Sequence, residues 1–186
     1  MNGRLRRNTG VSVATHSAPS EAPDSPAERF EDLYRRTFPR VYAYVASLLR
    51  DRSAAEEVTA QAFERAYRRR SSYRHGRGPV EAWLFGIARN AALDELRRRS
   101  RRAQLEDSAV AAAGTSTEDE ADGLLRRETV RSALASLDPR ERDLIALKFA
   151  GGLSNAEIAG VLGMSESNAG TRLHRTIEKL RRACHD

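Results

Sequence analysis

The chain has 186 residues, 40% of them hydrophobic, and a net charge of +6, which leaves room for one ordinary domain or two small ones with modest cores. Cys184 is the only cysteine, so an intrachain disulfide framework and a cysteine-based zinc site are excluded, as fits a reducing cytoplasm. No apolar run approaches the roughly 20 residues that cross a bilayer, so we expect a cytoplasmic protein without membrane insertion.

The first part of the chain predicts a tail followed by a helical domain. Residues 1–27 are rich in Ser, Ala, Thr and Pro and show no periodicity, so we expect a disordered tail. Apolar residues then recur at three- and four-residue steps, which predicts a first helical domain over residues 28–102. Its expected helices are one over about 30–49, one opened by a capping box of Ser53 and Glu56, and one over about 80–100.

The second part predicts a linker and another helical domain. Small and acidic residues dominate 103–123, where the net charge is −6, and indicate a flexible linker. In the second domain, 124–186, capping residues mark the expected helix starts: Asp138 with Pro139 and Glu141, Ser154 with Glu157, and Ser165. Since no stretch alternates with the period of a strand, we predict an all-α fold of two small helical domains on a flexible acidic linker.

Three small residues in the second domain have the spacing of a DNA-binding helix-turn-helix. Ala159 allows two helices to cross closely, Gly163 lies in the turn, and Ala169 packs on the inner face of the second helix. The exposed side of that helix then carries Ser165, Glu166, Ser167, Asn168, Thr171, Arg172 and Arg175, which can reach base edges and phosphates. The alternative is a plain helical hairpin with a solvated polar face.

Arginines and aromatic residues gather in the first domain, where the net charge over residues 30–102 is +8. They are Arg68 to Arg70, Arg74, Arg77 and Arg97 to Arg102, with Tyr73, Trp83 and Phe85 nearby. A basic groove with aromatic side chains suits single-stranded nucleic acid, whose bases stack while the backbone is neutralised. A solvated basic surface, with Trp83 in the core, is the alternative.

The sequence offers little to catalysis. It contains no Gly-rich phosphate loop, no Gly-x-Ser-x-Gly elbow and no histidine pair with metal-ligand spacing. We therefore expect no enzymatic activity, no metal and no cofactor.

Two segments resemble a known family. "PVEAWLFGIARNAALDELRRRSR" (79–101) looks like the promoter-melting segment of bacterial sigma factors of the extracytoplasmic-function group. "LASLDPRERDLIALKFAGGLSNAEIAGVLGMSESNAGTRLHRTIEKLRR" (134–182) looks like their C-terminal helix-turn-helix domain. The first domain is similar to the second conserved region of that family and the last domain to its fourth.

The resemblance implies a dissociable specificity subunit of RNA polymerase, whose partners are the clamp helices and flap of the core enzyme, promoter DNA and an anti-sigma factor. It implies that the double-stranded −35 element is bound by Ser165, Asn168, Thr171, Arg172 and Arg175. The melted −10 strand would lie along Tyr73, Arg74, Arg77, Arg89, Asn90, Arg97 and Arg98. The clamp helices would contact Glu56, Glu57 and Gln61, with Phe63 packed inward.

The sequence also departs from the family. Gly170 stands where a lysine is frequent and costs about 1 kcal/mol of helix stability relative to alanine. It either permits close approach to the DNA backbone or is a tolerated weakness. Ala60 and Gln61 replace the usual glutamine and acidic residue of the clamp-binding segment.

Two rival functions remain open. A regulator acting without polymerase core would normally carry a ligand pocket or a dimerisation element, and a protein-binding adaptor would leave both basic blocks unexplained.

Overall fold

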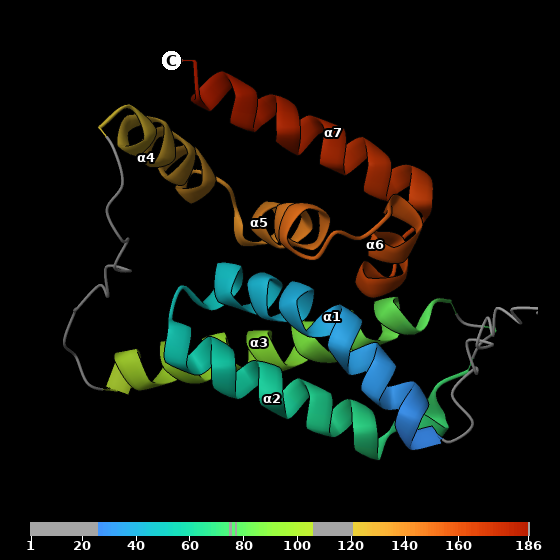
Figure 1. Ribbon diagram of the computed structural model, residues 1–186. Helices are drawn as coiled ribbons and strands as arrows, with labels where there is room; N and C mark the ends of the chain where they lie inside the picture. The colour runs from blue at the N-terminus through green and yellow to red at the C-terminus, as the bar shows by residue number, and fades with distance from the viewer. Residues whose placement is uncertain (1–25, 75, 77, 106–120, 186) are drawn as a thin grey trace, which may run out of the picture.

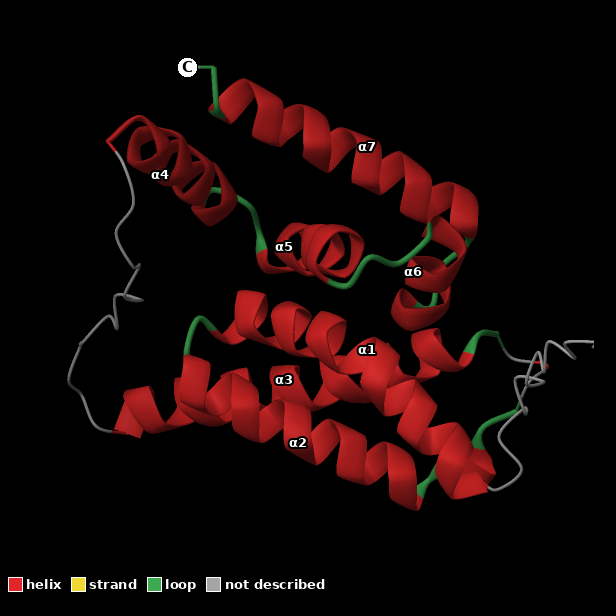
Figure 2. Cartoon of the chain, in the orientation of Figure 1, coloured by secondary structure: helices red, strands yellow, loops and turns green. Residues whose placement is uncertain are grey.

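The computed structural model describes residues 26–74, 76, 78–105 and 121–185. Within these ranges the chain forms helices and loops and no strand, which confirms the predicted all-α class (Figure 2). The first group of helices is α1 (Pro26–Leu49), α2 (Arg52–Arg68), the 3-10 turn η1 (Arg70–Ser72) and α3 (Val80–Leu105). The second group is α4 (Ala121–Ala135), α5 (Pro139–Ile145), the π-helical turn η3 (Ala146–Ala150), α6 (Asn155–Leu162) and α7 (Glu166–Ala183).

The first group is a three-helix layer in which each helix packs against the other two (Figure 1). The inner faces follow the predicted apolar stripes: Val41 and Val45 of α1, Val58 of α2 and Leu84 of α3 are all but inaccessible. Phe63 of α2 is buried among them, as expected.

The start of α2 differs from the prediction. Its N-cap is Asp51, whose side chain accepts a hydrogen bond from the Ala54 backbone N–H at 3.0 Å, so the capping box predicted at Ser53 and Glu56 is wrong. Asp51 precedes Ser53 and its carboxylate is the stronger acceptor, so the helix begins earlier. The bond from Ala54 holds the pKa of the Asp51 carboxyl below its usual range, with the Arg99 guanidinium adding to the effect.

In the second group, α5, α6 and α7 each begin at a predicted cap. Asp138 with Glu141 and Ser154 with Glu157 form complete capping boxes, and Ser165 accepts a bond from the Asn168 backbone N–H. Two backbone donors, chiefly that of Glu141, lower the pKa of the Asp138 carboxyl.

Two helix ends differ from the expected domain limits. α3 continues to Leu105 and α4 begins at Ala121, so both ends of the predicted linker, 103–123, are helical. The remainder of that linker and most of the predicted N-terminal tail lie outside the described residues. After Ile145 the chain forms η3 rather than a continuing α-helix, and Phe149 at this turn is 66% exposed.

The two groups of helices share one hydrophobic core. α1 packs against η3 and α3 against α6, so the second group lies on the first layer (Figure 1). Tyr44 of α1 and Phe85 of α3 meet edge to face at 5.6 Å between ring centroids, and both are fully buried in a cluster that also contains Leu147 and Ile158. The division into two domains therefore coexists with extensive packing between them.

Candidate nucleic-acid interface

The α6–turn–α7 unit has the geometry of a helix-turn-helix. Gly163 ends α6 in the left-handed region at φ 66°, where a side chain is disfavoured. Ala159 and Ala169, the small residues at the predicted crossing, are 5% and 1% exposed. The close crossing expected from these residues is therefore present.

One face of α7 carries the side chains predicted for duplex DNA. Ala169, Leu173 and Thr176 repeat at helical spacing and are buried, so the opposite side faces solvent. The exposed residues of the helix include Asn168, Thr171, Arg172 and Arg175, and its N-cap, Ser165, is exposed as well. Hydroxyl, amide and guanidinium groups along one exposed helix face supply the donors and acceptors that read a major groove.

Gly170 does not lie on that exposed face. A Cβ atom at Gly170 would meet the side-chain nitrogen of Asn155 at 3.4 Å. The missing side chain therefore favours packing of α7 against α6. This orientation counts against the interpretation that Gly170 brings the helix close to the DNA backbone.

A second cluster of predicted residues lies where α2 ends and α3 begins. The Tyr73 hydroxyl donates to the Gly78 carbonyl at 2.8 Å, and its ring lies 5.5 Å from that of Trp83. Arg74 is exposed, and Arg77 lies outside the described residues. An adjacent cavity of about 660 Å³ is lined by Arg29, Phe30, Asp32, Leu33, Arg36, Arg70, Ser71, Tyr73, Val80 and Trp83.

The aromatic residues of this region have different environments. Phe85 is fully buried beneath Tyr44, so the expectation that it helps to form a base-stacking groove is wrong. Its side chain points from α3 into the core that the two groups of helices share, and the sequence alone did not reveal that shared core. Trp83 is half-buried against the core and also borders the cavity. Its position therefore agrees in part with packing in the core and in part with a base-stacking groove.

The remaining residues predicted for the −10 strand are spread along α3. Asn90 is exposed, as are Arg97 and Arg98, which form ion pairs with Asp94 and Glu95 of the same helix at 3.0 and 2.7 Å. Such exposed pairs contribute little and leave an arginine available to a stronger anion. Arg89, in contrast, turns toward α5.

The predicted polymerase-binding residues share the outer side of α2. Glu56 and Glu57 are exposed, and Gln61 donates to Glu57 at 3.0 Å. Glu56 pairs with Arg52 at 3.1 Å. This side of the helix is thus acidic and open.

A buried polar cluster lies between the two groups of helices and was not predicted from the sequence. Asp143 of α5 is 4% exposed, accepts a hydrogen bond from the Tyr44 hydroxyl at 2.7 Å and pairs with Arg89 Nε at 2.6 Å. Burial, followed by the Asp143 charge, raises the pKa of Tyr44 well above its usual value. Asp143 stands one helical turn before Leu147, so an acidic residue in a core stripe was the available signal.

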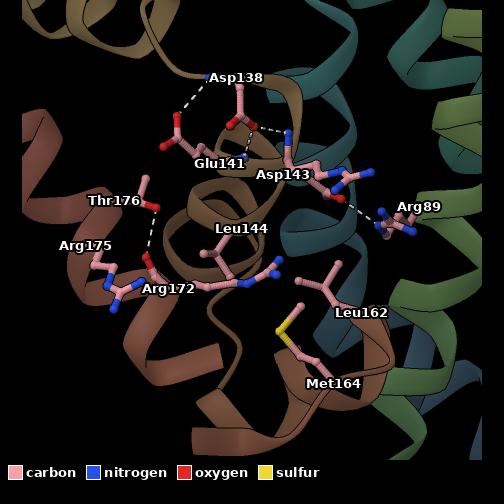
Figure 3. A pocket seen from close by; sticks show the side chains of 11 residues that line it. Arg89, Asp138, Glu141, Asp143, Leu144, Leu162, Met164, Arg172, Arg175 and Thr176 are labelled. Atoms are coloured by element: carbon pink, nitrogen blue, oxygen red, sulfur yellow. Dashed lines mark hydrogen bonds and ion pairs between the residues drawn. The ribbon is translucent and has the colours of Figure 1, made fainter. Parts of the chain in front are cut away.

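Arginines assigned to different promoter elements line one cavity beside this cluster. The cavity, of about 510 Å³, is bordered by Arg89 of α3 and by Arg172 and Arg175 of α7 (Figure 3). Asp143 and Met164 also border it. The structure therefore brings together residues for which the resemblance implies separate DNA sites.

Neither a membrane span nor a metal cluster is found in the described ranges. No helix there is long and apolar enough to cross a bilayer. The His, Cys, Asp and Glu side chains of these ranges form no group of three or more that could hold a metal ion.

Comparison with known proteins relates both groups of helices to transcription factors. The family model of sigma-70 region 2 matches residues 33–102, and that of sigma-70 region 4 matches residues 127–180. The RNA polymerase sigma factor CarQ of Myxococcus xanthus is 36% identical over 161 residues, which cover 85% of this chain and 90% of CarQ. The ECF RNA polymerase sigma factor SigL of Mycobacterium tuberculosis is 34% identical over 144 residues, covering 76% of this chain and 80% of SigL.

Solved structures share the fold. The sigma factor RpoE of Bartonella quintana, in complex with the anti-sigma factor NepR, superposes with a TM-score of 0.67 at 24% identity, covering 84% of this chain and 96% of RpoE. CnrH, in complex with the cytosolic domain of CnrY, gives a TM-score of 0.61 at 23% identity, with 84% and 87% coverage.

Proposed function

Because the chain belongs to the extracytoplasmic-function group of sigma-70 family sigma factors, we propose that it divides promoter recognition between its two groups of helices. It directs promoter-specific transcription initiation by RNA polymerase, and its family is one of non-enzymatic initiation factors. In this division residues 124–186 bind the −35 duplex and residues 28–102 bind the polymerase and the melted −10 strand.

The exposed polar face of α7 is the observation that carries the −35 assignment. Arg172 and Arg175 lie about one turn apart on that face. Both are C-terminal to the Ser165 cap and to the exposed first turn of the helix. Recognition helices contact base edges with their N-terminal residues, and arginine donates in bidentate fashion to guanine. Bases or phosphates are also contacted by three shorter polar side chains, those of Ser165, Asn168 and Thr171.

The loop before α3 and the exposed side of α3 support the −10 assignment. Tyr73 and Arg74 are presented at the loop, while Asn90, Arg97 and Arg98 follow along the helix. From residue 80 to residue 98 the helix rises about 27 Å, enough to follow several nucleotides of a single strand. Arg89 would join them once it leaves Asp143, and Arg77 is assigned to this set by the resemblance alone.

The acidic side of α2 supports polymerase binding. Glu56, Glu57 and Gln61 are held on one helix face by Asp51 at its N-cap and by the buried Phe63 behind it. We assign this face to the clamp helices and residues 124–186 to the flap. RpoE is solved in complex with the anti-sigma factor NepR, and CnrH in complex with the cytosolic domain of CnrY, which supports an anti-sigma partner and a cytoplasmic site of action here as well.

Run-off transcription tests the proposal. Purified bacterial core polymerase is supplied with fragmented DNA from the source genome, with and without the protein, and discrete transcripts should depend on it. Arg172→Ala and Arg175→Ala should each reduce these transcripts, whereas Arg181→Ala, an exposed arginine at the other end of α7, should not. Duplex DNA binding without any dependent transcript would instead support a regulator that acts without the core enzyme.

The polymerase contact has its own matched pair of variants. Glu57→Lys reverses the charge on the assigned face of α2, and Glu31→Lys reverses an exposed charge on α1. We expect only Glu57→Lys to weaken co-purification with core polymerase. If Glu57→Lys binds the core enzyme as tightly as Glu31→Lys and the wild type, the clamp contact does not lie on this face.

A further inference from the structure

Three of the arginines that border the cavity between α3, α5 and α7 have no acidic partner. Arg140 of α5 and Arg172 and Arg175 of α7 are exposed, and none of them forms an ion pair with another residue that the structure describes. The fourth, Arg89 of α3, pairs with Asp143 through Nε and keeps 26% of its side chain exposed. Guanidinium groups that border one cavity without carboxylate partners suit an anion from outside the chain.

The carboxylates that border the same cavity are already bound by donors of the protein (Figure 3). Asp138 accepts hydrogen bonds from two backbone N–H groups of α5 at 2.8 and 2.9 Å. Glu141 accepts from Lys179 Nζ at 2.7 Å. Asp143 is bound by the two donors described above. The binding capacity that remains in the cavity is therefore cationic.

The size and the apolar side of the cavity suit a small ligand with a flat ring. Its volume of about 510 Å³ lies within the range of about 300 to 1,000 Å³ that is usual for small-molecule sites. Leu144, Leu162 and Met164 form its apolar side. In Figure 3 they lie between Arg89 and Arg172, which face the cavity from α3 and α7. Aliphatic and thioether side chains pack against a nucleobase, while guanidinium groups around them pair with phosphate.

We propose that this cavity, the arginine cavity bordered by Arg89, Arg140, Arg172 and Arg175, binds a nucleoside polyphosphate. One phosphate group carries a charge of about −1.5 to −2 at pH 7, so two or three linked phosphates match the unpaired arginines better than one. While the ligand is bound, Arg172 and Arg175 pair with its phosphates and are withheld from the −35 duplex. This consequence rests on the proposed function of α7, whereas Arg140 has no assigned DNA contact and serves the ligand alone.

The walls of the arginine cavity are held in place before a ligand binds. Arg89 and Asp143 join α3 to α5 at 2.6 Å. Arg40 of α1 donates to the carbonyls of Gly151 and Gly152 at 2.8 and 3.2 Å, directly after η3. A site that is formed before its ligand arrives loses less conformational entropy on binding, which favours affinity.

Equilibrium dialysis of the full-length protein tests the site without DNA or polymerase. ATP and GTP serve as nucleotide probes, pyrophosphate as a probe with phosphates alone, and adenosine as a probe with the ring alone. We expect one nucleotide per chain, bound more tightly than pyrophosphate, and no binding of adenosine. Tight binding needs both the phosphates and the ring, because the arginines and the apolar side of the cavity act on different parts of the ligand.

A matched pair of arginine variants locates the site. Arg140→Gln should weaken nucleotide binding about tenfold to a hundredfold, because a charge-assisted contact is lost. Arg181→Gln removes an exposed arginine of α7 that does not border the cavity, and it should bind the nucleotide as the wild type does. Circular dichroism of both variants checks that weaker binding does not come from unfolding.

Competition with DNA gives a second readout, using a duplex that carries a −35 element mapped by run-off transcription. At a nucleotide concentration about ten times its Kd, the apparent Kd of the wild type for this duplex should rise about tenfold. The same concentration should change the value for Arg140→Gln by no more than about twofold. Without nucleotide, Arg140→Gln should bind the duplex as the wild type does.

The outcomes separate the nucleotide site from the proposed function. Equal nucleotide binding by Arg140→Gln and the wild type, or several nucleotides per chain, would overturn the site, since the protein would then attract anions through its net charge alone. Tighter binding of a hexaglutamate peptide than of either nucleotide would overturn it in favour of an acidic peptide. Nucleotide binding through Arg140 that leaves the duplex affinity unchanged would overturn the control of DNA binding. If one nucleotide binds through Arg140 while no transcript ever depends on the protein, the site is real and the promoter assignment fails.

Discussion

Removing the Arg89 guanidinium should destabilise the protein because it leaves the buried Asp143 carboxylate without its ion-pair partner. Asp143 is 4% exposed, and in Arg89→Met it would keep only the Tyr44 hydroxyl as a described side-chain donor. Breaking a buried ion pair typically costs about 3 to 5 kcal/mol. Arg89 is 26% exposed and the adjoining cavity admits water, so we expect a loss smaller than this range, of about 2 to 3 kcal/mol.

A double-mutant cycle isolates this term. Arg89→Met, Asp143→Asn and the double variant are unfolded with urea, and the free energies of unfolding are compared. In Asp143→Asn the side chain carries no charge that would need a partner. The free energy of unfolding lost in the double variant should therefore be less than the sum of the two single losses, with a coupling energy of about 1.5 to 3 kcal/mol. At this chain length the loss in Arg89→Met corresponds to a fall in Tm of about 4 to 12 °C.

The result that would refute this reasoning is additivity. If the two single losses sum to the loss in the double variant, the 2.6 Å contact contributes no pairwise energy. The pair would then act as two independently solvated charges, contrary to their burial.

Three further outcomes follow from the structure. Because the pKa of Tyr44 is raised in the folded state, the stabilising contribution of its hydroxyl is complete below pH about 10 and is lost as pH rises through the folded-state pKa. The stability of Tyr44→Phe should therefore depend less on pH in the alkaline range, as measured by thermal melts above pH 9. Gly151→Ala would place a Cβ atom 2.7 Å from the Leu147 carbonyl oxygen and should cost about 1 to 3 kcal/mol in urea unfolding, whereas Gly160→Ala, which meets no atom within 4 Å, should add about 0.5 to 1 kcal/mol. Arg172→Ala should weaken binding to the −35 duplex by about 1 to 3 kcal/mol in a salt titration, and Arg181→Ala should not.

Local signals accounted for most of the helices. The capping boxes at Asp138 and Ser154 and the left-handed Gly163 depend on residues within one turn of each other, so sequence spacing was sufficient to locate them. The predicted N-cap of α2, Ser53, was wrong because Asp51 is a competing cap close by, and only the folded backbone decides between the two.

Contacts between distant segments could not be predicted in this way. Tyr44 and Asp143 are 99 residues apart, and neither has a local feature that identifies the other as its partner. The same limit explains Phe85, whose aromatic ring suited a base-stacking surface until the second group of helices covered it. For the DNA-binding and polymerase-binding residues, the face of each helix followed from periodicity, whereas their roles came from the resemblance and stay predictions.

The contact from Arg40 to the end of η3 bears on how freely the two halves of this protein can be exchanged. The carbonyls of Gly151 and Gly152 in one half accept from a side chain of the other half, and Asp143 depends on donors from that half in the same way. A chimera that combines residues 121–186 with the first half of a relative would therefore need an arginine equivalent to Arg40 and donors equivalent to Tyr44 and Arg89. The modularity suggested by separate DNA targets is limited by these shared polar contacts.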